Sequence, residues 1–123
     1  MNTRFVLSLC AALASLTLVT APAFAHARLD HANPRVGSTV QSAPRQVTLW
    51  FTEKVEPAFS RIEVRDDAGN RVDIGKAVVD KSNPVELHIA VKPLRAGTYK
   101  VFWRVLSVDT HKTEGRFSFR VER

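Results

Sequence analysis

The strongest constraint on the fold is a two-residue alternation of apolar side chains that recurs along the chain after residue 26. Val47, Leu49 and Phe51 alternate with more polar neighbours. The same alternation recurs at Ile62 and Val64, at Val85, Leu87, Ile89 and Val91, at Tyr99, Val101, Trp103 and Val105, and at Phe117, Phe119 and Val121. Successive side chains of a strand point to opposite faces, so this period is typical of strands with one face on a core and one in water.

Turn-forming residues separate these apolar segments. They occur at Asn33-Pro34 with Gly37-Ser38, at Ser42-Ala43-Pro44, from Asp66 to Asn70, at Ser82-Asn83-Pro84, and at Lys92-Pro93 with Gly97. About seven short strands with a turn every 8–12 residues or so predict an antiparallel, immunoglobulin-like β-sandwich. The sequence therefore predicts an all-β fold, with one domain over residues 26–123.

Residues 1–25 have the features of a secretory signal peptide in the usual order. Arg4 precedes an apolar run over residues 5–19, and Ala23-Phe24-Ala25 forms an A-x-A cleavage signal. The run is shorter than the roughly 20 apolar residues of a membrane-spanning helix. We therefore expect residues 1–25 to be cleaved and the remaining domain to be a soluble monomer outside the cytoplasmic membrane.

Composition disfavours several classes of protein. The single cysteine, Cys10, lies in the predicted leader, so we expect neither a disulfide nor a thiolate metal site in the exported part. The chain has 18 Lys and Arg residues against 12 Asp and Glu residues. These basic residues alternate along strands without clustering around aromatic residues, which argues against nucleic-acid binding. We interpret them mainly as a solvated polar face, with weak attraction to anionic lipid or an acidic partner as the alternative.

Cleavage after Ala25 would make His26 the first residue of the mature chain. An N-terminal histidine offers its imidazole Nδ1 and its α-amine to one metal ion in a six-membered chelate ring. Asp109 and His111 offer a second pair of donors, because residues two apart in an extended segment project to the same side. The resulting set of three nitrogens and one oxygen suits copper(II), whereas calcium and magnesium require more oxygen ligands. A chance histidine and a capped turn beside a surface histidine are the alternatives.

Motifs along the whole predicted mature chain support the same interpretation. The chain has His26-Ala27-Arg28-Leu29 and the block over residues 47–55, and its C-terminal part contains Gly97-Thr98-Tyr99, Trp103-Arg104-Val105, Ser107, Asp109, His111, Gly115, Phe117 and Phe119. In these motifs it resembles the CopC family of periplasmic copper-binding proteins. The resemblance implies a cupredoxin-like or immunoglobulin-like sandwich and one copper(II) bound by His26, Asp109 and His111. It also implies a role in copper homeostasis or resistance, often beside an inner-membrane CopD-type partner.

The chain departs from the family pattern in two places. Thr110 stands where the family commonly has glycine, so a positive φ at this position would strain the threonine. The only methionine is Met1. Because copper(I) selects soft sulfur ligands, we infer a member that binds copper(II) only.

Five other residues have interpretations that do not involve a metal. We interpret His31 as a surface histidine, with an outer-shell role near the metal as the alternative, and we expect His88 to be exposed on the polar face of its strand. Trp50 and Trp103 are expected in or near the core. Tyr99 lies where sandwiches form a tyrosine corner, a hydrogen bond from the phenol to a nearby backbone carbonyl.

Two other function classes use similar features. Copper monooxygenases that attack polysaccharides also use an amine with two imidazoles, but they need an open metal position and a broad substrate surface. Here Asp109 would fill that position, and we find no catalytic triad, phosphate loop or carboxylate pair. We therefore expect a copper carrier or buffer that is not an enzyme. The third class is an immunoglobulin-like adhesion or assembly module with incidental histidines.

Overall fold

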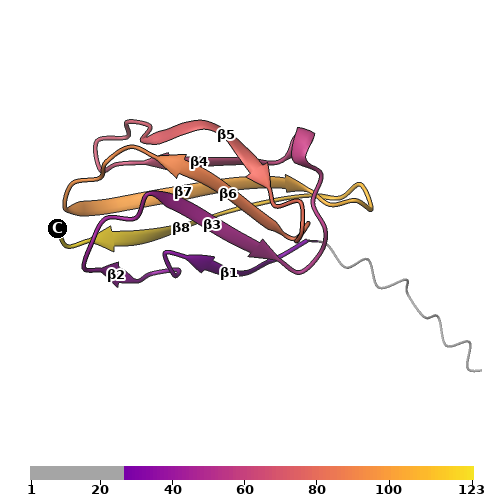
Figure 1. Ribbon diagram of the computed structural model, residues 1–123, viewed down its shortest axis with the longest axis horizontal. Helices are drawn as coiled ribbons and strands as arrows, with labels where there is room; N and C mark the ends of the chain where they lie inside the picture. The colour runs from indigo at the N-terminus through magenta and orange to yellow at the C-terminus, as the bar shows by residue number, and fades with distance from the viewer. Residues whose placement is uncertain (1–26) are drawn as a thin grey trace, which may run out of the picture.

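The computed structural model describes residues 27–123, which form two stacked β-sheets (Figure 1). The elements are β1 (Leu29–Asn33), β2 (Thr39–Val40), β3 (Gln46–Phe51), the 3₁₀ turn η1 (Pro57–Phe59), β4 (Arg61–Arg65), β5 (Asp73–Val79), β6 (Glu86–Val91), β7 (Gly97–Leu106) and β8 (Lys112–Val121). The first sheet has the order β1-β3-β6-β5 and the second sheet the order β2-β8-β7-β4. The predicted all-β sandwich is confirmed, with eight strands in place of about seven. The predicted leader and His26 lie outside the described residues.

The two sheets are antiparallel except at one edge. There β2 runs parallel to β8, with Thr39 opposite Arg120 and Val40 opposite Val121. The short strand β2 forms this parallel pair where the chain crosses from β1 in the first sheet to the second sheet. The longest ladder joins β7 to β8. Residues 107–111 connect these two strands at one end of the sandwich, so the hairpin carries Asp109 and His111 on its connection.

The residues of the two-residue alternation fill the space between the sheets. Val47 and Leu49 from the first sheet, and Val101 and Val105 from the second, are all fully buried. Burying an aliphatic side chain of this size contributes about 1.5–3 kcal/mol relative to leaving it exposed. The sheets also meet through an aromatic contact, because the ring of Phe51 meets the indole of Trp103 edge-on with 5.1 Å between centroids. Trp103 is half-buried, as predicted.

Tyr99 forms the predicted corner bond. Its hydroxyl donates to the backbone carbonyl of Arg95 at 2.6 Å, four residues upstream. Burial raises the pKa of this phenol above its ordinary value of 10.0, although the bond to Arg95 acts in the opposite direction. The bond fixes the entry into β7, the strand that leads to Asp109. No helix in the described part of the chain is long and apolar enough to cross a membrane.

Candidate metal centre

The hairpin connection is built around Ser107, which is fully buried. Its backbone N–H donates to the carbonyl of His111 at 3.0 Å, and its own carbonyl accepts from the N–H of Thr110 at 2.9 Å. Its hydroxyl donates to the carboxylate of Asp109 and accepts from the N–H of His111 at 3.3 Å. One buried serine therefore organises the segment from Ser107 to His111 and orients the Asp109 side chain.

A neighbouring segment holds this turn in place. Val55 and Ser107 form an isolated antiparallel bridge. The N–H of Val108 donates to the carbonyl of Lys54 at 3.1 Å, and the N–H of Glu56 donates to the carbonyl of Leu106 at 2.8 Å. These bonds attach residues 106–108 of the hairpin to the segment of residues 54–56. The side chains of Asp109 and His111 remain partly accessible.

The structure brings Asp109 and His111 together, as the sequence predicted. Nδ1 of His111 lies 3.3 Å from Oδ1 of Asp109, and the two side chains are 34% and 41% exposed, respectively. Two donors at this separation subtend roughly 100–110° at a metal about 2.1 Å from both, which suits two neighbouring ligands of one ion. The spacing of these two donor atoms fits a metal ligand pair, and Nδ1 of His111 is itself buried.

The backbone conformation that brings Asp109 and His111 together is a turn, whereas the sequence analysis predicted an extended segment. Val108 and Asp109 lie in a turn closed by the Thr110-to-Ser107 hydrogen bond. Thr110 has φ of +73°, in the left-handed region. A β-branched residue is strained there, typically by about 1–3 kcal/mol. The turn, not strand alternation, places the two donors on one side, and Thr110 adopts the conformation for which glycine is better suited.

Asp109 is held in its charged form. The hydroxyl of Ser107 lowers the pKa of the Asp109 carboxyl below its ordinary value of 3.8; burial opposes this shift, and His111 adds to it through its side chain and its backbone N–H. A carboxylate that is already ionised at neutral pH needs to lose no proton before it binds a cation.

The first described residues are fixed beside this loop. Ala27 is fully buried, and its carbonyl accepts a hydrogen bond from the hydroxyl of Thr113 at 2.7 Å. Arg28 donates its N–H to Oγ1 of Thr52 at 3.0 Å, and its carbonyl accepts from the N–H of Thr52 at 2.9 Å. Thr113 lies two residues beyond His111, so Ala27 is tied to the same end of β8 as the donor pair.

Among residues 27–123, no three His, Asp or Glu side chains gather into a metal site. Asp109 and His111 are therefore the two predicted donors that this part of the chain brings together. His26, the predicted source of two further donors, lies outside the described residues. Sequence reasoning missed the roles of Ser107 and Thr113; the only signal was the two-residue and four-residue spacing of Ser107 from the two donors.

Comparison with known proteins identifies the family. A family model described as the CopC domain matches residues 29–122. The chain belongs to the CopC family. It is 38% identical to Protein YobA of Escherichia coli strain K12 over 94% of this chain and 95% of that protein. It is 34% identical to Copper resistance protein C of Xanthomonas campestris pv. juglandis, over 89% and 91% of the two chains.

A solved structure supports the same membership. The crystal structure of CopC from Methylosinus trichosporium OB3b is similar to this chain with a TM-score of 0.74 and 37% identity, covering 79% of this chain and 94% of that one. The comparison confirms the predicted family resemblance and sandwich fold.

Two further histidines in the described part of this CopC-family chain, His31 and His88, lie on the outer face of the first sheet. The His31 ring stacks on Trp50 with 4.3 Å between centroids, and its Nδ1 lies 2.6 Å from Oδ2 of Asp30. His31 is exposed, as the surface interpretation requires. His88 is only half-buried, not fully exposed as expected, because it lies between β3 and β5, opposite Thr48 and Val78.

Proposed function

We propose that this protein is a periplasmic copper(II)-binding protein of copper homeostasis or resistance, which binds one copper(II) through His26, Asp109 and His111. The observation that carries the proposal is the pair of Asp109 and His111 donor atoms 3.3 Å apart. Membership of the CopC family supports copper as the metal, since relatives of this chain are named copper resistance proteins.

The place of Ala27 supports His26 as the remaining ligand. Ala27 directly follows His26 in the chain and is bonded to Thr113, two residues beyond His111. Cleavage after Ala25 would give His26 a free α-amine, whose ordinary pKa of about 7.7–8.0 makes its deprotonation cost about 1.0–1.4 kcal/mol at neutral pH. Metal-binding free energies of order 10 kcal/mol exceed that cost. The full donor set would be three nitrogens and one oxygen, which suits copper(II).

The first experiment tests the N-terminal donor. Protein recovered from the periplasm is analysed by intact mass, and copper(II) binding is measured by calorimetry and electron paramagnetic resonance. A matched protein with one glycine ahead of His26 keeps the imidazole but moves the α-amine away. We expect a start at His26, one copper(II) per chain, and clearly weaker binding with altered spectra for the extended protein. Equal binding by the two proteins would rule out the amine as a ligand.

The second experiment tests the hairpin donors. His111→Ala removes an imidazole ligand and should weaken copper(II) binding by several kcal/mol, about three orders of magnitude for 4 kcal/mol. Asp109→Asn keeps the side-chain shape but removes the charge, so it should cost less. His88→Ala is the matched control, because His88 lies on the outer face of β6 and opposite Thr48. A loss for His88→Ala as large as that for His111→Ala would contradict the assignment.

We further propose that the protein carries or buffers copper(II) and does not catalyse oxidation, because Asp109 would occupy the metal position that an oxygen-activating enzyme keeps open. The wild type should show negligible peroxide-dependent oxidation of polysaccharide, and Asp109→Asn should gain redox cycling. Robust cleavage by the wild type would move the protein to the monooxygenase class.

The absence of cysteine and methionine after residue 10 supports binding of copper(II) only. Under reducing conditions, a copper(I) chelator should therefore remove all bound copper(I). Retention against a strong chelator would contradict this proposal. An inner-membrane CopD-type protein remains the proposed partner for copper transfer.

A further inference from the structure

The outer face of the second sheet gathers basic side chains. Its inward residues, such as Ile62, Val101 and Phe117, are buried, so the alternate residues of β4, β7 and β8 point outward. These outward residues include seven basic and two acidic side chains around one aromatic ring. We call the following set the basic face: Arg61, Glu63, Arg65, Lys100, Phe102, Arg104, Lys112, Glu114, Arg116 and Arg120.

The register of the strands places like charges opposite each other on this face. Arg61 of β4 is opposite Arg104 of β7, and Arg65 is opposite Lys100. Directly opposed like charges destabilise a sheet. The chain thus carries two cross-strand repulsions that an anionic ligand would relieve.

The acidic residues of the basic face neutralise only part of this charge. Glu114 lies 3.1 Å from Nη2 of Arg104, and Glu63 lies 3.0 Å from Nε of Arg65. Within residues 27–123, no carboxylate lies within ion-pair distance of the five remaining basic side chains. They are Arg61, Lys100, Lys112, Arg116 and Arg120.

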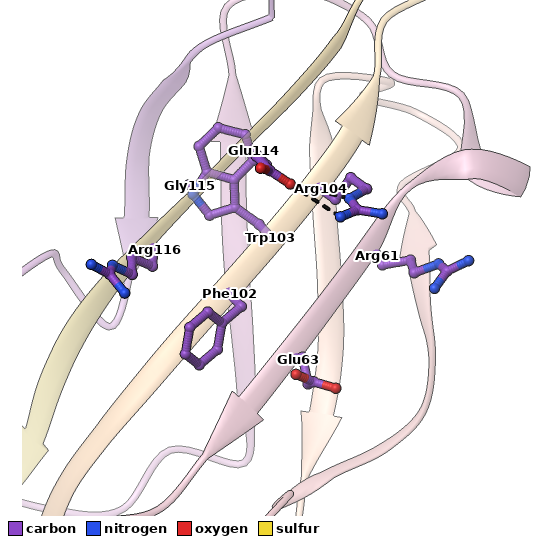
Figure 2. Close-up of a pocket in the computed structure, with 8 residues that line it drawn as sticks. All are labelled: Arg61, Glu63, Phe102, Trp103, Arg104, Glu114, Gly115 and Arg116. Carbon is purple, nitrogen blue, oxygen red and sulfur yellow. Dashed lines mark hydrogen bonds and ion pairs between the residues drawn. The ribbon is translucent and has the colours of Figure 1, made fainter. Parts of the chain in front are cut away.

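The basic face is hollowed at its centre. An open groove there has a volume of about 580 Å³. Among the residues that line it, Phe102 lies between Arg116 on one side and Arg61 and Arg104 on the other (Figure 2). A second hollow shares Arg61 and Arg104 with this groove and continues to Phe59, which is 65% exposed. The combined groove therefore runs from the centre of the sheet toward the end of the hairpin.

We propose that the basic face binds an extended acidic segment of a partner protein. Carboxylates of the segment pair with the arginines, and an apolar side chain between them packs on Phe102. Alternate residues of an extended chain lie about 6.6–6.8 Å apart, which matches the two-residue step from Arg104 to Phe102 along β7. A concave groove with an apolar centre suits a polypeptide better than the flat surface of a bilayer. The proposal does not depend on copper.

The test uses the peptide Glu-Ser-Leu-Ser-Glu, blocked at both ends, and its neutral counterpart Gln-Ser-Leu-Ser-Gln. Each is titrated into the isotopically labelled protein and followed by backbone amide shifts. We expect shifts from the acidic peptide in β4, β7 and β8, and none from the neutral peptide. In Arg61→Gln/Arg116→Gln the affinity should fall by about fivefold or more, and salt should weaken binding to the wild type.

The matched control removes the same charge elsewhere. Arg45→Gln/Lys76→Gln changes two exposed basic residues outside the basic face and should change affinity by less than about twofold, since only general attraction is reduced. Equal losses in the two double variants would overturn the proposal. It would also be overturned by the absence of amide shifts with the acidic peptide, whether or not phosphatidylglycerol vesicles bind. Vesicle binding lost in the Arg61/Arg116 variant would then identify the basic face as a membrane-docking surface.

Discussion

The indole of Trp103 lies so close to Gly115, its cross-strand partner, that a Cβ added at residue 115 would lie 2.5 Å from Cζ2 of the ring. Two non-bonded heavy atoms cannot lie this close together, so the indole or the backbone would have to move. Trp103 also packs against Phe51 from the first sheet. The absence of a side chain at Gly115 is therefore what allows the indole to lie between the sheets at this end.

Gly115→Ala should lower the free energy of unfolding by about 1–3 kcal/mol, because the methyl group forces the indole from its place. Urea denaturation measures this loss, and tryptophan fluorescence should shift at the same time. Adding Trp103→Phe should recover part of the loss, since the smaller ring leaves room for the methyl. Unchanged stability of the single variant would contradict the packing argument.

The two-residue alternation was sufficient to predict the strands that fill the core. It failed for β5, where Ile74 and Val78 are about half exposed and Gly75 has φ of +73°. The ladder between β5 and β6 shifts register between Ile74 and Val78. A strand with such an irregularity at the edge of a sheet loses its alternating pattern, because its side chains no longer divide cleanly between core and solvent.

The proximity of Asp109 and His111 was predictable from the sequence, but the geometry that produces it was not. Asp109 and His111 were found from their donor types and spacing, and the family pattern indicated that Thr110 occupies a glycine position. The organising role of Ser107 depends on hydrogen bonds within a turn, and its two-residue and four-residue spacing from the two donors does not by itself reveal those bonds.

Thr110→Gly should stabilise the protein by about 0.5–1 kcal/mol. Relief of the strained φ of +73° outweighs the greater backbone freedom of glycine in the unfolded chain. Thr110→Ala is the matched control, since alanine shares the restriction on positive φ and should gain little. Thermal and urea denaturation of both variants test the difference. If the two variants are equally stable, strain at this residue is negligible.

Ser107→Ala should weaken copper(II) binding by about tenfold, because residues that orient metal ligands typically contribute 10–100-fold to affinity. Ser60→Ala is the control: Ser60 is also buried, and its hydroxyl donates to the carbonyl of Glu56 at 2.7 Å. Both variants should lose stability, but only Ser107→Ala should lose copper affinity. Calorimetric titration distinguishes them, and equal affinities would show that Ser107 has a structural role alone.

Asp73 should make stability depend on pH. Burial alone would raise the pKa of its carboxyl, but hydrogen bonds from Arg71 and from the N–H of Val64 lower it below the ordinary value of 3.8. The stabilisation is therefore fully present above the unfolded-state pKa of about 3.9 and is lost as pH falls through the lower folded-state value.

Asp73→Asn tests this dependence. The difference in unfolding free energy between wild type and variant should be constant from about pH 5 to 7 and shrink below about pH 4. Denaturation curves at each pH measure it, and a difference independent of pH would exclude the carboxylate charge as the cause.

The hydrogen bond between Thr113 and the carbonyl of Ala27 has a practical consequence for any preparation of the protein. Residue 27 is tied to the end of the sandwich that carries Asp109 and His111, whereas the C-terminus lies at the opposite end (Figure 1). An affinity tag left ahead of residue 27 would add its own ligands and bulk beside this loop, and a polyhistidine tag there would compete for the same ion. A tag without metal-binding side chains, fused after Arg123, is held away from the hairpin and leaves this loop unobstructed.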